Sequence, residues 1–150
     1  MSSTASKIIT TIQEGMIDSI KQIVPIQTDS VDSTFVSKNI SLNFAVLVGL
    51  TGDIKGKILY KGELSLFGSV GEIMFGMKIE GDMLKSFAGE LGNMISGGLC
   101  TNLSSKGIVI DITSPTILEG SSTISGFKEA VEIEVYFQNG EKLSIVVMID

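Results

Sequence analysis

The feature that most constrains this chain is a helical pattern of unusual length over residues 82–104. Its apolar residues recur at intervals of three and four, the period of an amphipathic α-helix with one side in a core. Taking 100° per residue, Ser86, Glu90, Asn93 and Gly97 fall on one face, in a stripe about 60° wide. We call these four residues the polar stripe and predict that it faces outward. The residues predicted to face the core are Leu84, Phe87, Ala88, Leu91, Met94 and Ile95.

The polar stripe offers a carboxylate and an amide one turn apart, with a small residue at each end. Such a surface supplies hydrogen-bonding groups over which another backbone can pass closely. Exposed Glu and Asn on an amphipathic helix are usually only solvated, so an inert face is the first interpretation. The same helix also contains Gly89, Gly92, Gly97 and Gly98, each costing about 1 kcal/mol relative to Ala. These glycines indicate close packing, or close approach by another chain.

The rest of the chain mixes helical and strand periods. Helical spacing appears in segments 3–24 and 63–75, with Pro25 ending the first of them. Alternation of apolar and polar residues predicts strands or hairpins at 29–38, 40–61, 108–112 and 130–149, with 116–126 as a loop or edge segment. Residues 1–150 are therefore predicted to form one α+β domain, in which long amphipathic helices pack on a mainly antiparallel sheet of five or so strands.

The first helical segment repeats part of the stripe. Thr10 and Glu14 have the spacing of Ser86 and Glu90, but position 17 is Ile where the later helix has Asn93. The first helix therefore lacks the amide.

Composition removes most kinds of catalytic site. The chain has no His, and its eleven basic residues are all Lys. Ser–His and Cys–His nucleophile pairs, His-bearing metal sites and bidentate Arg phosphate clamps are therefore excluded. The formal net charge of −6 argues against a nucleic-acid partner, because phosphate neutralisation needs a basic surface. Any chemistry has to rest on carboxylates, amides, hydroxyls, Lys and the backbone.

Targeting and redox signals favour the cytoplasm. Apolar residues make up 43% of the chain, but the strongest apolar run, residues 44–50, is far shorter than a membrane span. Residues 1–7 lack a signal-peptide profile, so we expect a cytoplasmic protein without membrane association. Cys100 is the one cysteine, which permits no intramolecular disulfide and predicts a buried, unreactive thiol.

The helix motif and the segment after it resemble the CheC/CheX/FliY family of bacterial chemotaxis phosphatases. That family has an acidic residue or Ser, then Glu after three residues, Asn after two more, and a Pro some twenty-two residues later. Ser86, Glu90 and Asn93 match this spacing, whereas Pro115 comes one residue early. Residues 48–60 look like the first hairpin of the family. The chain is most similar to the shorter, single-motif CheX-like members, and the lack of an Asn at position 17 agrees with that.

The resemblance implies hydrolysis of the aspartyl phosphate of a CheY-like response regulator. By motif position, Glu90 would anchor the regulator through an ion pair with a Lys, and Asn93 would orient the attacking water. Ser86, Gly89 and Gly97 would contact the partner, although Ser86 receives no specific role. No cofactor is expected on this chain, because the regulator would supply Mg²⁺ and the phosphorylated Asp. Members of this kind are dimers, so a homodimer is also expected.

Two other interpretations stay open at this level. The same helix face could dock a response regulator or a flagellar-switch component without catalysis. The stripe could also be an inert surface of a globular domain. Binding without faster dephosphorylation would favour the first of these, and neither effect would favour the second.

Overall fold

The computed structural model describes residues 3–36 and 39–150. The last two residues of the predicted strand 29–38, and the first two of the N-terminal segment used to predict localisation, lie outside these ranges. The elements in chain order are α1 (Ser3–Ile23), β1 (Thr28–Val36), β2 (Ile40–Gly52), β3 (Gly56–Gly62), α2 (Leu64–Phe75), α3 (Gly81–Ser104), β4 (Ile110–Ile112), β5 (Thr116–Ile124), β6 (Glu129–Phe137) and β7 (Lys142–Ile149).

The strands form one sheet in the order β1-β6-β7-β3-β2-β4, with β5 also paired to β2. Every pairing is antiparallel, so the predicted α+β fold with an antiparallel sheet is confirmed. Within the described residues the sheet has seven strands, more than the five or so predicted. The β6–β7 hairpin turns at Asn139-Gly140, where Gly140 has a φ of 88° that favours glycine.

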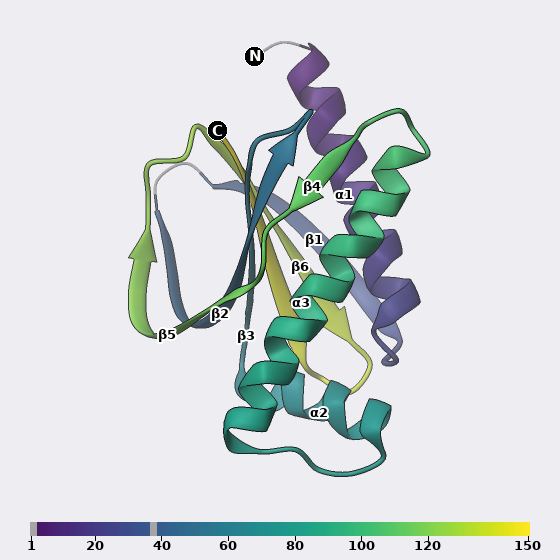
Figure 1. Ribbon diagram of the computed structural model, residues 1–150, viewed down its shortest axis with the longest axis vertical. Helices are drawn as coiled ribbons and strands as arrows, with labels where there is room; N and C mark the ends of the chain where they lie inside the picture. The colour runs from purple at the N-terminus through teal and green to yellow at the C-terminus, as the bar shows by residue number, and fades with distance from the viewer. Residues whose placement is uncertain (1–2, 37–38) are drawn as a thin grey trace.

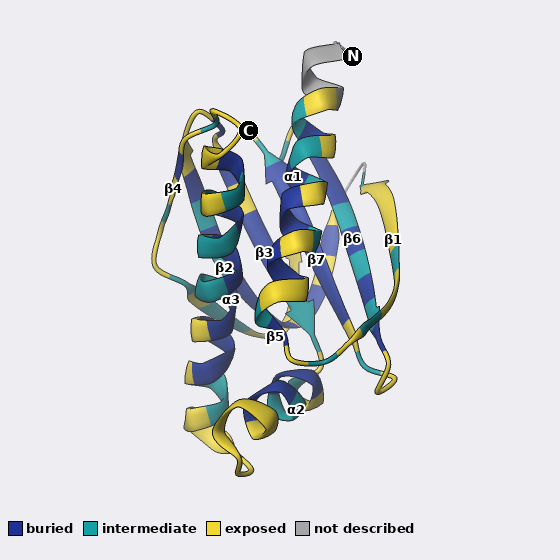
Figure 2. Cartoon of the chain, turned by 90° about the vertical axis from the view of Figure 1, so that its right-hand side faces the viewer, coloured by how far each residue is buried: buried dark blue, intermediate teal, exposed yellow. Residues whose placement is uncertain are grey.

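Two long helices, α1 and α3, lie side by side on one face of the sheet, and α2 crosses its lower end (Figures 1 and 2). Gly15 of α1 lies against Leu99 of α3, whereas Ser19, further along α1, lies against Gly98. Contacts that run in opposite directions along the two helices show that they pack antiparallel. The main hydrophobic core fills the space between these helices and the sheet.

A smaller core lies on the other face of the sheet and includes Ile40 and Leu42 of β2. The register of β2 against β5 shifts between Leu42 and Phe44. Because a register shift reverses the alternation of side chains, Phe44 belongs to the helix-side core while Leu42 does not. Segment 116–126, predicted as a loop or edge, is largely the edge strand β5, which pairs along β2 (Figure 1).

Candidate functional site

The polar stripe lies on the outer side of α3. Ser86 and Glu90 are exposed, and Asn93 and Gly97 are half-buried. Most of the apolar residues predicted to face the core are buried, whereas Leu84 and Met94 are only half-buried. Helix α3 begins at Gly81 with Glu80 as its N-cap residue, so Asp82 lies in its first turn. A carboxylate there complements the positive end of the helix dipole.

The side chains of Glu90 and Asn93 have no hydrogen-bond or ion-pair partner within residues 3–36 and 39–150. One turn earlier, by contrast, Lys85 Nζ lies 2.9 Å from Glu119 Oε2 of β5. The fold therefore uses the charge at position 85 internally and leaves the Glu90 carboxylate and the Asn93 amide available to another molecule.

Gly89 does not belong to the exposed surface, contrary to its predicted place in a partner contact. It is buried, and a Cβ atom added there would lie 3.3 Å from Ile117 Cδ1 and 3.7 Å from Pro115 Cγ. The absence of a side chain thus lets α3 approach the β4–β5 segment. Pro115 consequently lies beside the helix motif even though it comes one residue early in the sequence.

The other helix glycines divide into two groups. A Cβ at Gly92 would lie 2.9 Å from Val46 Cγ1, and one at Gly98 would lie 3.1 Å from Ser19 Cβ, so these positions bring α3 onto the sheet and onto α1. A Cβ at Gly97 would meet nothing within 4 Å. Of the two predicted reasons for these glycines, close packing explains Gly89, Gly92 and Gly98. Close approach by another chain stays the prediction for Gly97.

Two buried hydrogen bonds fix the rotation of α3 beside Asn93, and sequence reasoning missed both. The Tyr60 hydroxyl lies 2.7 Å from Ser96 Oγ, and Ser19 Oγ donates to the Ile95 carbonyl at 2.7 Å. Burial raises the pKa of Tyr60 well above its usual range, so the phenol stays protonated and can keep its hydrogen bond. A Ser on the core side of an amphipathic helix was the available signal, because buried hydroxyls need partners.

Cys100 is half-buried near the C-terminal end of α3. Burial, reinforced by the charge of Asp111, raises the pKa of its thiol. A raised pKa disfavours the reactive thiolate, which agrees with the predicted lack of reactivity. Within the described residues no group of three His, Cys, Asp or Glu side chains could hold a metal ion.

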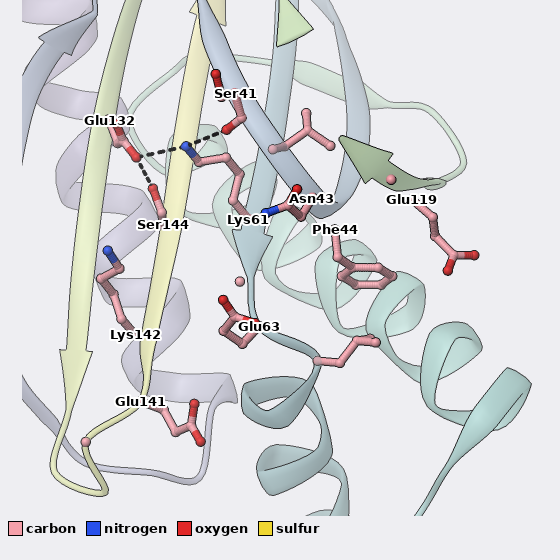
Figure 3. A pocket seen from close by; sticks show the side chains of 15 residues that line it. Ser41, Asn43, Phe44, Lys61, Glu63, Glu119, Glu132, Glu141, Lys142 and Ser144 are labelled. Carbon is pink, nitrogen blue, oxygen red and sulfur yellow. Dashed lines mark hydrogen bonds and ion pairs between the residues drawn. The ribbon is translucent and has the colours of Figure 1, made fainter. Parts of the chain in front are cut away.

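A cavity of about 600 Å³ lies away from the polar stripe, between β2, β3, β5 and the β6–β7 hairpin (Figure 3). Lys61 follows the core residue Tyr60 and so points to the other face of the sheet. Its Nζ lies 3.3 Å from Glu132 Oε2 and donates to the Ser41 carbonyl at 3.3 Å, and Ser144 Oγ donates to the same Glu132 carboxylate. These groups satisfy one another, so the stripe on α3 stays the candidate site.

Comparison with known proteins identifies the family of this chain. The family model described as "Chemotaxis phosphatase CheX" matches residues 44–138, a span that contains α3 and Pro115. The chain belongs to the CheX family. The resemblance inferred from the helix motif is thereby confirmed at the level of the family.

One named relative and two solved structures are also similar to this chain. A protein of Thermotoga maritima named CheY-P phosphatase CheX is 28% identical over 119 residues, which cover 77% of each chain. A CheX crystal structure from Desulfovibrio desulfuricans has a TM-score of 0.79 at 21% identity, covering 96% of this chain and 99% of that one. A CheX–CheY complex with BeF3 and Mg from Borrelia burgdorferi has a TM-score of 0.72 at 21% identity, covering 94% and 96%. The two structures show the shared fold.

None of the helices in the described part of the chain is both long and apolar enough to cross a membrane.

Proposed function

We propose that this protein is a phosphatase that hydrolyses the aspartyl phosphate of a CheY-like response regulator in bacterial chemotaxis. The observation that carries the proposal is the pair formed by Glu90 and Asn93. Both are accessible and unpartnered within the described residues, and both lie on the motif helix of a CheX-family chain. The relative from Thermotoga maritima is named a CheY-P phosphatase, which supports the same substrate.

In the proposed mechanism, Asn93 enters the active site of the regulator and its side-chain amide orients a water molecule in line with the phosphorus. The water oxygen forms a bond to phosphorus while the bond to the aspartyl oxygen breaks. Inorganic phosphate leaves, and the Asp carboxylate of the regulator is restored. Phosphoryl transfer is catalysed mainly by positioning and electrostatic stabilisation, so an amide suffices where His and Arg are absent.

Glu90 is proposed to anchor the regulator through an ion pair with one of its Lys side chains. Glu90 precedes Asn93 by three residues and shares its helix face, so the ion pair would hold the amide over the phosphoryl group. Mg²⁺ is expected in the regulator, as the CheX–CheY complex from Borrelia burgdorferi contains BeF3 and Mg. This chain would contribute no cofactor of its own.

The shape of the site supports a protein substrate. The stripe lies on a helix surface, and none of its residues lines the cavity between β2 and the β6–β7 hairpin. A convex site of this kind reaches into a partner. The open space over Gly97 would let a loop of the regulator lie against the helix backbone.

The assembly and location belong to the same proposal. Residues 1–150 would act as one CheX-like domain in the cytoplasm, where a response regulator is phosphorylated. A homodimer is proposed because, among the described residues, β1 and β5 each pair with only one strand in the sheet, and a free edge can pair with a second copy. Sedimentation or light scattering tests this assembly, and a monomer at assay concentrations would rule it out there.

The deciding experiment follows the loss of phosphate from a purified CheY-like receiver domain in Mg²⁺. We expect the wild-type protein to speed the decay and Asn93→Ala to give no acceleration. Asn43→Ala is a matched control, because Asn43 is also accessible but lies in β2, and it should behave as the wild type. An undiminished rate in Asn93→Ala would reject the assigned residue. Saturable binding without any acceleration by wild type would instead favour a non-catalytic docking module.

A further inference from the structure

Exposed apolar side chains gather at one end of the molecule. Within the described residues, seven large hydrophobic side chains are exposed, and five of them lie between positions 73 and 83. The other two, Phe35 and Val109, are isolated in the sequence. We call the five residues the 73–83 patch; they are between 41% and 62% exposed and comprise Ile73, Met74, Phe75, Met77 and Met83. Figure 2 shows this exposed region at the C-terminal end of α2 and in its connection to α3.

The backbone that carries the 73–83 patch is well fixed. Helix α2 ends at Gly76, whose φ is 70° and whose N–H donates to the Glu72 carbonyl at 2.9 Å. Ile79, in the connection, is buried in the main core. The Phe75 ring packs edge-on against Phe87 of α3, with centroids 5.5 Å apart. The fold therefore holds the backbone of this segment in place while its apolar side chains face solvent.

The 73–83 patch adjoins the polar stripe through Met83. Met83 precedes Ser86 by three residues and Glu90 by seven, so it lies on the same face of α3, about 10 Å along the axis from Glu90. A globular partner of roughly 100 residues has a radius of gyration of about 13 Å. A body that covers Glu90 and Asn93 can therefore also cover Met83 and extend toward the connection that leads into α3.

We propose that the 73–83 patch is a second contact for the same response regulator, which meets it with an apolar surface beside its phosphorylated Asp. This inference rests on the proposed function. Contiguous exposed apolar residues are typical of interaction sites, and flexible Met side chains adapt to a partner surface. The stripe would act on the phosphoryl group, whereas the patch would supply affinity that does not depend on phosphorylation.

The test replaces two exposed Met residues and measures binding and turnover separately. In Met77→Ser/Met83→Ser, we expect about tenfold weaker binding to a receiver domain loaded with BeF3 and Mg²⁺, from the loss of roughly two methylene groups' worth of apolar contact. The same ratio should hold for the unphosphorylated receiver. KM for the phosphorylated receiver should rise to match, with kcat changed less than about twofold.

The matched control is Val109→Ser, because Val109 is 61% exposed but lies between α3 and β4, beyond the end of α3 that is away from Met83. It should leave binding unchanged, and both variants should keep the wild-type Tm. Wild-type affinity in the double Met variant would overturn the docking role. A change in oligomeric state with unchanged KM would also overturn it, since the patch would then join two copies of this chain. A wild-type protein that neither binds nor dephosphorylates the receiver would instead reject the proposed function itself.

Discussion

Helices α1 and α3 lie antiparallel on the same face of the sheet but use their polar side chains differently. On α1, Glu14 Oε2 lies 3.8 Å from Lys106 Nζ, and Asp18 Oδ2 accepts a hydrogen bond from Asn102 Nδ2 at 3.4 Å. Ile17 packs partly buried against the main core. The polar groups of α1 are therefore used to join it to α3 and to the turn that follows α3.

On α3 the matching positions have no such partners. Glu90 and Asn93 have the spacing of Glu14 and Ile17, yet neither side chain forms an ion pair or hydrogen bond in the described part of the chain. The fold could hold its helices together without these two residues. Polar groups that a fold leaves unpaired on a fixed helix are better candidates for function than equally polar groups that it uses.

The largest expected effect comes from moving the amide from α3 to α1. In Asn93→Ala/Ile17→Asn, we expect turnover of the phosphorylated receiver to stay as low as in Asn93→Ala, at least about 100-fold below wild type, the scale of losing one positioned polar group. Position 17 faces the core, so an Asn there would not reach a partner. Ile17→Asn alone should keep the wild-type kcat, which shows that the fold survives. Recovery of turnover in the double variant to within about tenfold of wild type would show that the amide works equally well on α1 and on α3.

The next prediction concerns how much the packing of α1 against α3 contributes to stability. A Cβ at Gly98 would lie 3.1 Å from Ser19 Cβ and would also meet Ser19 Oγ, which donates to the Ile95 carbonyl. Gly98→Ala should lower the free energy of unfolding by about 2 kcal/mol despite the better helix propensity of Ala. Urea denaturation measures this. A stabilised variant would mean that α1 and α3 can move apart without cost.

A matched pair of Glu substitutions gives a smaller effect. Glu90→Ala should weaken binding of the phosphorylated receiver about tenfold and slow its turnover, because a charged contact is lost. Glu14→Ala, at the corresponding position of α1, should leave both unchanged. Its ion pair is solvent-exposed, so stability should change by less than about 0.5 kcal/mol. Equal kinetic effects from both substitutions would contradict the distinction between the helices.

The smallest effect is expected at Gly97, the neighbour of Gly98. A Cβ there meets nothing within 4 Å, so Gly97→Ala should raise the free energy of unfolding by up to about 1 kcal/mol. If a loop of the regulator passes over this point, the same variant should bind the receiver more weakly. Thermal unfolding and receiver titration measure the two changes. Greater stability with unchanged affinity would remove Gly97 from the docking surface.

Local patterns predicted most of the elements. The three helices begin and end within about two residues of their predicted bounds, because apolar spacing, Pro25 and glycines mark them. The β6–β7 hairpin followed from Asn139-Gly140. Strand β5 could not be identified with the same certainty, since its sequence is rich in Ser and Gly and its pairing with β2 joins positions such as Ile40 and Ile124. Such pairing depends on contacts that no local pattern encodes.

The same division holds at the candidate site. Helical geometry was enough to place Glu90 and Asn93 on the outside of α3. It was not enough for Gly89, because Pro115 and Ile117, which cover it, come from a segment whose position depends on the sheet. The hydrogen bond between Tyr60 and Ser96 joins residues 36 positions apart and was likewise beyond local reasoning. The chemical groups of the site were readable in the sequence, whereas the contacts that support them required the fold.

The strand order has a consequence for how the protein is made. The β6–β7 hairpin, from the last residues of the chain, lies between β1 and β3 in the sheet. A ribosome releases α1, β1 and the whole of α3 before the strands that join β1 to β3 exist. Non-local pairing of this kind slows folding and leaves apolar surface exposed meanwhile. A premature stop after residue 128 would therefore produce a chain with every stripe residue but a sheet in two pieces, a substrate for chaperones and proteases.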